Sequence, residues 1–123
     1  MINPIYNLPE IQFVGGESQI LLFNLVSNAG RAFDAKGCKI SLALIPFINK
    51  RGNPVVIKEA ELIEGARGMY NIARFELKPN DTVHLVGEYI YQITIINEDN
   101  ISEIPSQGIM HIVKNIHTNY ITG

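Results

Sequence analysis

Hydrophobic and polar residues alternate along several short stretches of this chain, and the clearest stretch runs from Leu85 to Ile96. Within it, Tyr89, Tyr91, Ile93 and Ile95 occupy every second position. Side chains two residues apart in a strand share a face, so the pattern predicts a half-buried β-strand. The residues between them form a more mixed face, and aromatic and β-branched side chains favour a strand over a helix.

Similar alternation recurs in other segments, separated by clusters of Gly, Asn and Pro. Further strands are expected at residues 11–14, 18–26, 38–44, 55–64, 69–77 and 109–113. Seven or eight short strands at roughly even spacing predict an all-β sandwich or barrel. The expected core consists of the apolar faces of these strands: Leu21, Phe23, Leu25, Ile40, Leu42, Leu44, Phe75, Leu77, Tyr89, Tyr91, Ile93 and Ile95.

The start of the clearest strand carries a further signal. Leu85, Gly87 and Tyr89 have the spacing of a tyrosine corner, in which the Tyr hydroxyl bonds back to the backbone a few residues earlier. Such a corner leads into one strand of an immunoglobulin-like sandwich. The expected fold is therefore an immunoglobulin-like antiparallel β-sandwich of about seven or eight strands.

The chain divides into an extended arm at residues 1–10, a sandwich domain at 11–113 and a tail or linker at 114–123. The two ends are polar and short, yet each contains apolar residues. We expect these to contact a neighbouring subunit, as an added strand or a draped arm. The alternative is two disordered ends with incidental hydrophobic residues. The candidate partner contacts are Ile5, Tyr6 and Leu8 in the arm and Ile116, Tyr120 and Ile121 in the tail.

Composition narrows the function classes. The 123 residues are 46% hydrophobic and 18% charged, which indicates one globular domain. The net charge of −2 argues against a protein that binds nucleic acid by neutralising phosphates. No window reaches the roughly 18 apolar residues of a membrane span. The start, Met-Ile-Asn-Pro, lacks the basic and apolar regions of a signal peptide, so synthesis in the cytoplasm without export is expected.

The sequence contains few features that indicate a catalytic or metal-binding site. His84, His111 and His117 are far apart and lack acidic or cysteine neighbours at metal-ligand spacing. Cys38 lies in an apolar run, where a buried thiol is the expected state. The Gly15-Gly16 segment is not followed by the Lys of a phosphate loop, and a flexible strand connection is the expected role. We therefore expect no enzyme activity, no cofactor and no metal site.

A succession of motifs adds a family resemblance. The motifs, in chain order, are Gly-Glu-Ser before Gln19-Ile-Leu-Leu-Phe-Asn-Leu25, Gly30 with Phe33-Asp34, Gly37-Cys-Lys-Ile-Ser-Leu42, Asn80-Asp-Thr-Val-His-Leu-Val-Gly-Glu-Tyr89, Gln92-Ile-Thr-Ile95 and Gly108-Ile-Met-His-Ile112. Together they resemble the N-terminal domain of the baseplate upper proteins of tailed phages that infect Gram-positive bacteria. The likeness spans roughly residues 11–113.

The resemblance implies a structural virion protein of a phage or prophage tail baseplate. Such a protein would link the tail hub to receptor-binding proteins, dock on other tail proteins and form a homo-oligomer in the particle. Family members usually continue into further domains, and the resemblance transfers no catalytic residue. The alternative is a carbohydrate- or surface-binding β-sandwich that recognises its ligand through loops.

Overall fold

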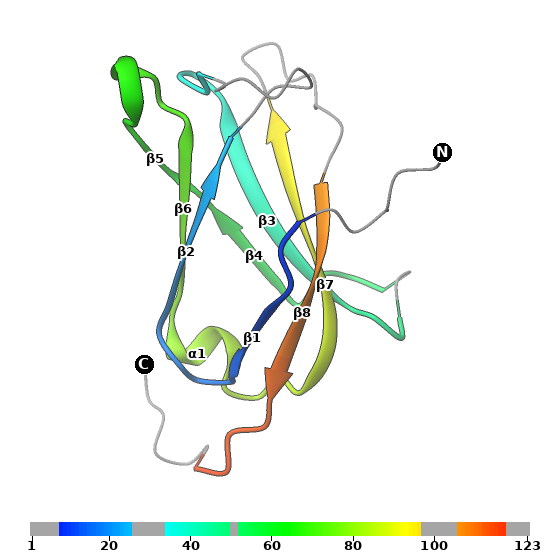
Figure 1. Cartoon of the computed structure of the whole chain (residues 1–123). Helices are drawn as coiled ribbons and strands as arrows, with labels where there is room; N and C mark the ends of the chain where they lie inside the picture. Colours follow the sequence, from blue (N-terminus) through cyan, green and yellow to red (C-terminus); the bar gives the residue numbers. More distant parts are fainter. Residues whose placement is uncertain (1–7, 26–33, 50–51, 97–105, 118–123) are drawn as a thin grey trace.

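The computed structural model describes residues 8–25, 34–49, 52–96 and 106–117. These residues form two β-sheets that pack against each other (Figure 1). Hydrophobic side chains lie between the two sheets. The larger sheet has the strand order β1 (Ile11–Val14), β8 (Ser106–Val113), β7 (Gly87–Ile96), β3 (Lys39–Pro46) and β4 (Val56–Glu59). The smaller sheet has the order β2 (Gln19–Asn24), β6 (Ile72–Leu77) and β5 (Glu61–Ile63). The all-β sandwich expected from the sequence is confirmed.

The strand pairs are antiparallel except for β1 and β8, which are parallel. Two short helical segments join the strands: a 3-10 turn at Ala66–Gly68 and α1 at Pro79–Thr82. Helix α1 begins with a proline, whose fixed φ suits the first helical turn. The Lys78 N–H donates to Asp81 Oδ2 at 2.7 Å, which occupies one backbone donor at the start of this helix.

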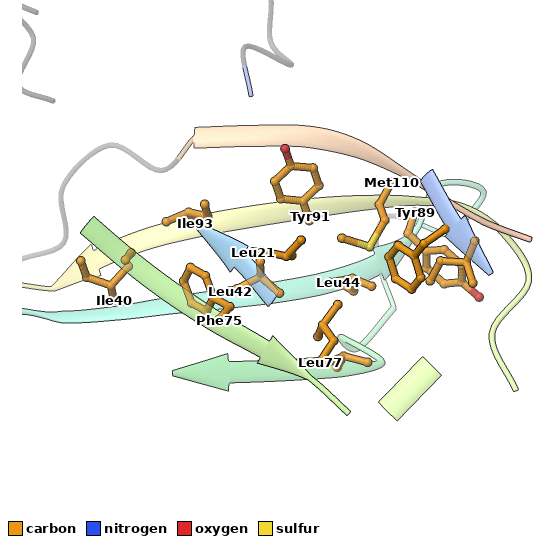
Figure 2. Close-up of a cluster of buried hydrophobic side chains, with 14 of the residues drawn as sticks. Leu21, Ile40, Leu42, Leu44, Phe75, Leu77, Tyr89, Tyr91, Ile93 and Met110 are labelled. Carbon is orange, nitrogen blue, oxygen red and sulfur yellow. The ribbon is translucent and has the colours of Figure 1, made fainter. Parts of the chain in front are cut away.

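The core lies between the two sheets and follows the predicted faces (Figure 2). Of the twelve residues expected there, ten are buried, and Phe23 and Ile95 are half-buried against the same cluster. Phe23 packs edge-on against Phe75, with ring centroids 5.9 Å apart. The core also includes residues outside the expected set, among them Phe13, Met110 and Ile112.

The single strand expected at residues 55–64 is wrong. This stretch forms two strands that belong to different sheets: β4 pairs with β3, and β5 pairs with β6. The chain crosses between the sheets at Ala60, whose N–H donates to the Ile40 carbonyl at 2.8 Å. Ala60 is half-buried and packs against the core. Local alternation cannot reveal such a change of partner, because it reports only the face of a strand.

Candidate docking surface

The predicted corner residues meet at the start of β7. The Tyr89 hydroxyl accepts a hydrogen bond from the Val86 N–H at 3.2 Å and donates to the Val86 carbonyl at 3.3 Å. Leu85, the neighbour of Val86, is half-buried against the core. Gly87 has a φ of 107°, a conformation that disfavours residues with a Cβ. The tyrosine side chain therefore closes the turn that links α1 to β7.

Replacing Tyr89 with phenylalanine should lower the free energy of unfolding by about 1 kcal/mol, the usual net value of one lost hydrogen bond. The ring would still fill its buried position in the core. Urea denaturation of both proteins at the same pH measures the difference. An unchanged unfolding midpoint would mean that the hydroxyl contact contributes nothing to stability.

The arm expected at residues 1–10 is partly integrated into the sandwich. The Leu8 N–H donates to the Gln107 carbonyl at 3.0 Å, and the Leu8 side chain packs against the core. Glu10 Oε1 lies 2.6 Å from His111 Nε2. Residues 8–10 thus lie along β8, and Leu8 is better explained by its own core than by a neighbouring subunit.

A buried tyrosine fixes this N-terminal segment. The Tyr91 ring lies against Gly108, its partner on β8, where a Cβ would approach the ring to 2.6 Å. Beyond Gly108 the Tyr91 hydroxyl donates a hydrogen bond to the Pro9 carbonyl. The glycine therefore leaves room for an aromatic side chain that connects β7 to the segment before β1.

Stability should fall as the pH rises above 10, because burial raises the pKa of Tyr91 from 10.0 to about 12. Between these values the unfolded chain releases the Tyr91 proton and the folded chain retains it, so alkaline pH favours unfolding. Urea midpoints at pH 9 and pH 11 should differ more for the wild type than for Tyr91→Phe. Equal pH dependence in the two proteins would contradict this role of Tyr91.

The other candidate partner contacts fall into two groups. Ile116 follows β8 and is 83% exposed. Its neighbour Asn115 is anchored, because its side-chain amide donates to the Gly15 carbonyl at 2.7 Å. Ile5, Tyr6, Tyr120 and Ile121 lie outside the described residues. Within the described residues Ile116 is therefore the tail candidate, and its side chain lies in solvent.

Sequence reasoning missed an apolar group on the outer face of the larger sheet. We call it the outer apolar patch: Ala43, Ile45, Ile57, Ile90 and Ile109. Ile45, Ile90 and Ile109 are in register on β3, β7 and β8, and Ile57 on β4 lies opposite Ala43. These positions alternate with the core residues of their strands, so they point away from the core. Ile57 is 65% exposed, whereas Ile90 in the middle strand is only 5% exposed.

Polar residues border the outer apolar patch. On one side the Gln107 amide donates to Gln92 Oε1 at 2.7 Å, and the Gln92 amide donates to Thr94 Oγ1 at 3.0 Å. On the other side His111 lies between Glu10, at 2.6 Å, and Glu88, at 3.6 Å. An apolar centre with a polar border is typical of a surface that binds another protein.

The described residues contain no group of three or more His, Cys, Asp or Glu side chains that could hold a metal ion. Cys38 is half-buried against the core. None of the helices within the described ranges has the length and apolar character to cross a membrane.

The chain matches no protein-family model, and a search of curated proteins finds no match either.

Proposed function

We propose that this chain is a structural, non-enzymatic component of a phage or prophage-derived tail baseplate, in which it docks on neighbouring tail proteins. The observation that carries the proposal is the outer apolar patch, a group of aliphatic side chains built by four adjacent strands. A sheet face of this kind suits an extended contact with a rigid neighbour. The motif succession in the sequence supports the assignment to a phage tail.

We further propose that the sandwich is immunoglobulin-like, and the strand order supports this. In a variable-type immunoglobulin sandwich, strands G, F, C and C′ share one sheet, and B, E and D belong to the other. Strands β8, β7, β3 and β4 follow the first order, and β2, β6 and β5 follow the second. Strand β7 would then be strand F, and its Tyr89 is located where a tyrosine corner is expected.

Incorporation into particles tests the proposed function. The full chain and its Ile57→Lys variant, each carrying an affinity tag, would be produced in the phage-forming strain, and particles would be isolated by sedimentation. The wild type should co-sediment with tails, and Ile57→Lys should do so much less, because it buries a charge at the contact. Thermal unfolding should be nearly unchanged, since Ile57 is exposed.

Three other results are informative. Absence of the wild type from all particles would overturn the proposed function. Normal incorporation of Ile57→Lys would place the docking surface elsewhere, with Ile116→Lys as the next variant. Retention on a glycan array without any protein partner would favour the carbohydrate-binding alternative.

A further inference from the structure

Strand β2 is the longest edge strand among the described residues, and it contains no charged residue. It lies at one edge of the smaller sheet, beside β6, and reads Gln-Ile-Leu-Leu-Phe-Asn over six residues (Figure 1). Natural edge strands are commonly protected by charge, proline or shortness against pairing with other chains. Strand β4 has Lys58, whose ammonium lies 2.7 Å from Asp81 Oδ2, and β5 has only three residues, including Glu61. Such protection is missing from β2.

The register identifies the backbone groups at the free edge of β2. The Leu25 N–H donates to the Asn71 carbonyl at 2.7 Å, so this opposed pair is hydrogen-bonded. Hydrogen-bonded and non-hydrogen-bonded pairs alternate along an antiparallel ladder. Leu21 and Phe23 therefore direct their backbone groups to β6, whereas Ile20, Leu22 and Asn24 direct theirs away from it. Among the described residues no strand pairs with β2 on that side.

The side chains of the same three residues are exposed. Ile20 is 54% exposed and Leu22 is 61% exposed, and both lie on the outer face of the smaller sheet. An apolar strand with a regular row of unpaired donors and acceptors is a template for another extended strand. The occupant of this edge should therefore be a β-strand.

We propose that the occupant is β2 of a second copy of this chain, paired antiparallel about a two-fold axis at Leu22. In this register Leu22 faces Leu22 of the other copy, and Ile20 faces Asn24. The pairing gives about six inter-chain hydrogen bonds, two for each of three opposed pairs, and uses every free backbone group of the three residues. Ile20 and Leu22 of both copies would meet in one apolar group on the outer face.

The charge distribution favours a second copy over a charged peptide. Antiparallel self-pairing places no two like charges opposite each other, because β2 contains none. The nearest charged strand, β6, would be about 14 Å from its counterpart, three strand spacings away and beyond the Debye length in physiological salt. On β6, Arg74 is balanced by Glu61 and Glu76 at 3.4 Å and 3.8 Å. The edge is therefore electrostatically compatible with its own copy.

Analytical ultracentrifugation of the full chain over a range of concentrations tests the pairing. The wild type should form dimers, and Leu22→Lys should raise the dimer Kd by about tenfold or more, since two lysines would meet at the axis. Ile48→Lys is the control, because Ile48 is an exposed aliphatic residue after β3 that belongs neither to β2 nor to the outer apolar patch. It should leave the Kd unchanged, and thermal unfolding of both variants should match the wild type at concentrations below the wild-type Kd, where the chain is monomeric.

A disulfide reports the register directly. In a Cys38→Ala background, Leu22→Cys should give a covalent dimer on oxidation, because opposed residues of a hydrogen-bonded pair have Cα atoms about 5.5 Å apart. Ile48→Cys should not. A monomeric wild type, or equal effects of Leu22→Lys and Ile48→Lys, would overturn the inference. The inference rests on the proposed function and names one partner of the chain, its own second copy. If the chain is monomeric in solution but still enters particles, the pairing is wrong and the proposed function stands.

Discussion

Replacing Phe75 with alanine should lower the free energy of unfolding by about 3–5 kcal/mol, the range for large aromatic residues in a core. Phe75 is fully buried between the sheets, and Phe23 packs edge-on against it. Truncation removes the transfer free energy of the ring and leaves a cavity that the two sheets cannot close. For a small domain this is a large share of total stability.

Phe23→Ala is the matched comparison, because it removes the same side chain from a diagonal position on the neighbouring strand β2. Phe23 is only half-buried, so Phe23→Ala should lower the free energy of unfolding by less than Phe75→Ala. Urea denaturation of the two variants and the wild type measures both values. If Phe23→Ala lowers the free energy of unfolding by as much as Phe75→Ala or more, Phe75 is not the more deeply packed of the two rings.

Replacing Gly15 with alanine should destabilise the fold by about 1–3 kcal/mol, the range for adding a methyl group to a closely packed site. A Cβ at Gly15 would lie 2.5 Å from the Thr82 carbonyl oxygen and 3.2 Å from that of Leu85. Both contacts are with backbone, which cannot rotate away as a side chain can. The next residue, Gly16, is also held there, because its N–H donates to Thr82 Oγ1 at 2.9 Å.

Gly52→Ala controls for the intrinsic effect of the substitution. Its Cβ would approach the Asn49 side-chain amide to 2.8 Å, and Asn49 is an exposed turn residue whose side chain can move. Thermal unfolding should therefore show a much larger decrease in Tm for Gly15→Ala than for Gly52→Ala. Similar decreases in Tm would mean that the backbone near Thr82 moves to make room for the added methyl group.

The same glycine pair shows where sequence reasoning ends. Gly15 and Gly16 were expected to form a flexible strand connection, but they pack closely against the end of α1. That contact joins positions 66 residues apart. No local pattern reports it, because the sequence around the glycines is the same whether or not a helix lies beside them.

Features that depend on local periodicity were predicted well. The alternation of Tyr89, Tyr91, Ile93 and Ile95 identified the inward face of β7 before the partner strands were known. By contrast, the parallel pairing of β1 with β8 and the crossing at Ala60 depend on where distant segments meet. The hydrogen bond from Tyr91 to Pro9 across Gly108 also depends on where distant segments meet.

The candidate surface was harder to predict than the fold. Ile90 belongs to the mixed face of its strand, next to Gln92 and Thr94, and alone it indicates no site. It becomes part of a patch only when β3 and β8 bring Ile45 and Ile109 beside it. The sequence directed attention to the chain ends instead, where Leu8 proved to pack against its own domain.

The most direct test of the central proposal is electron microscopy of particles from the phage-forming strain, with a gold-labelled tag on this chain. We predict that the label lies at the tail baseplate and that it is lost or strongly reduced in Ile57→Lys. Particles with intact tails and no label at the baseplate, from cells that produce the tagged wild-type chain, would contradict it.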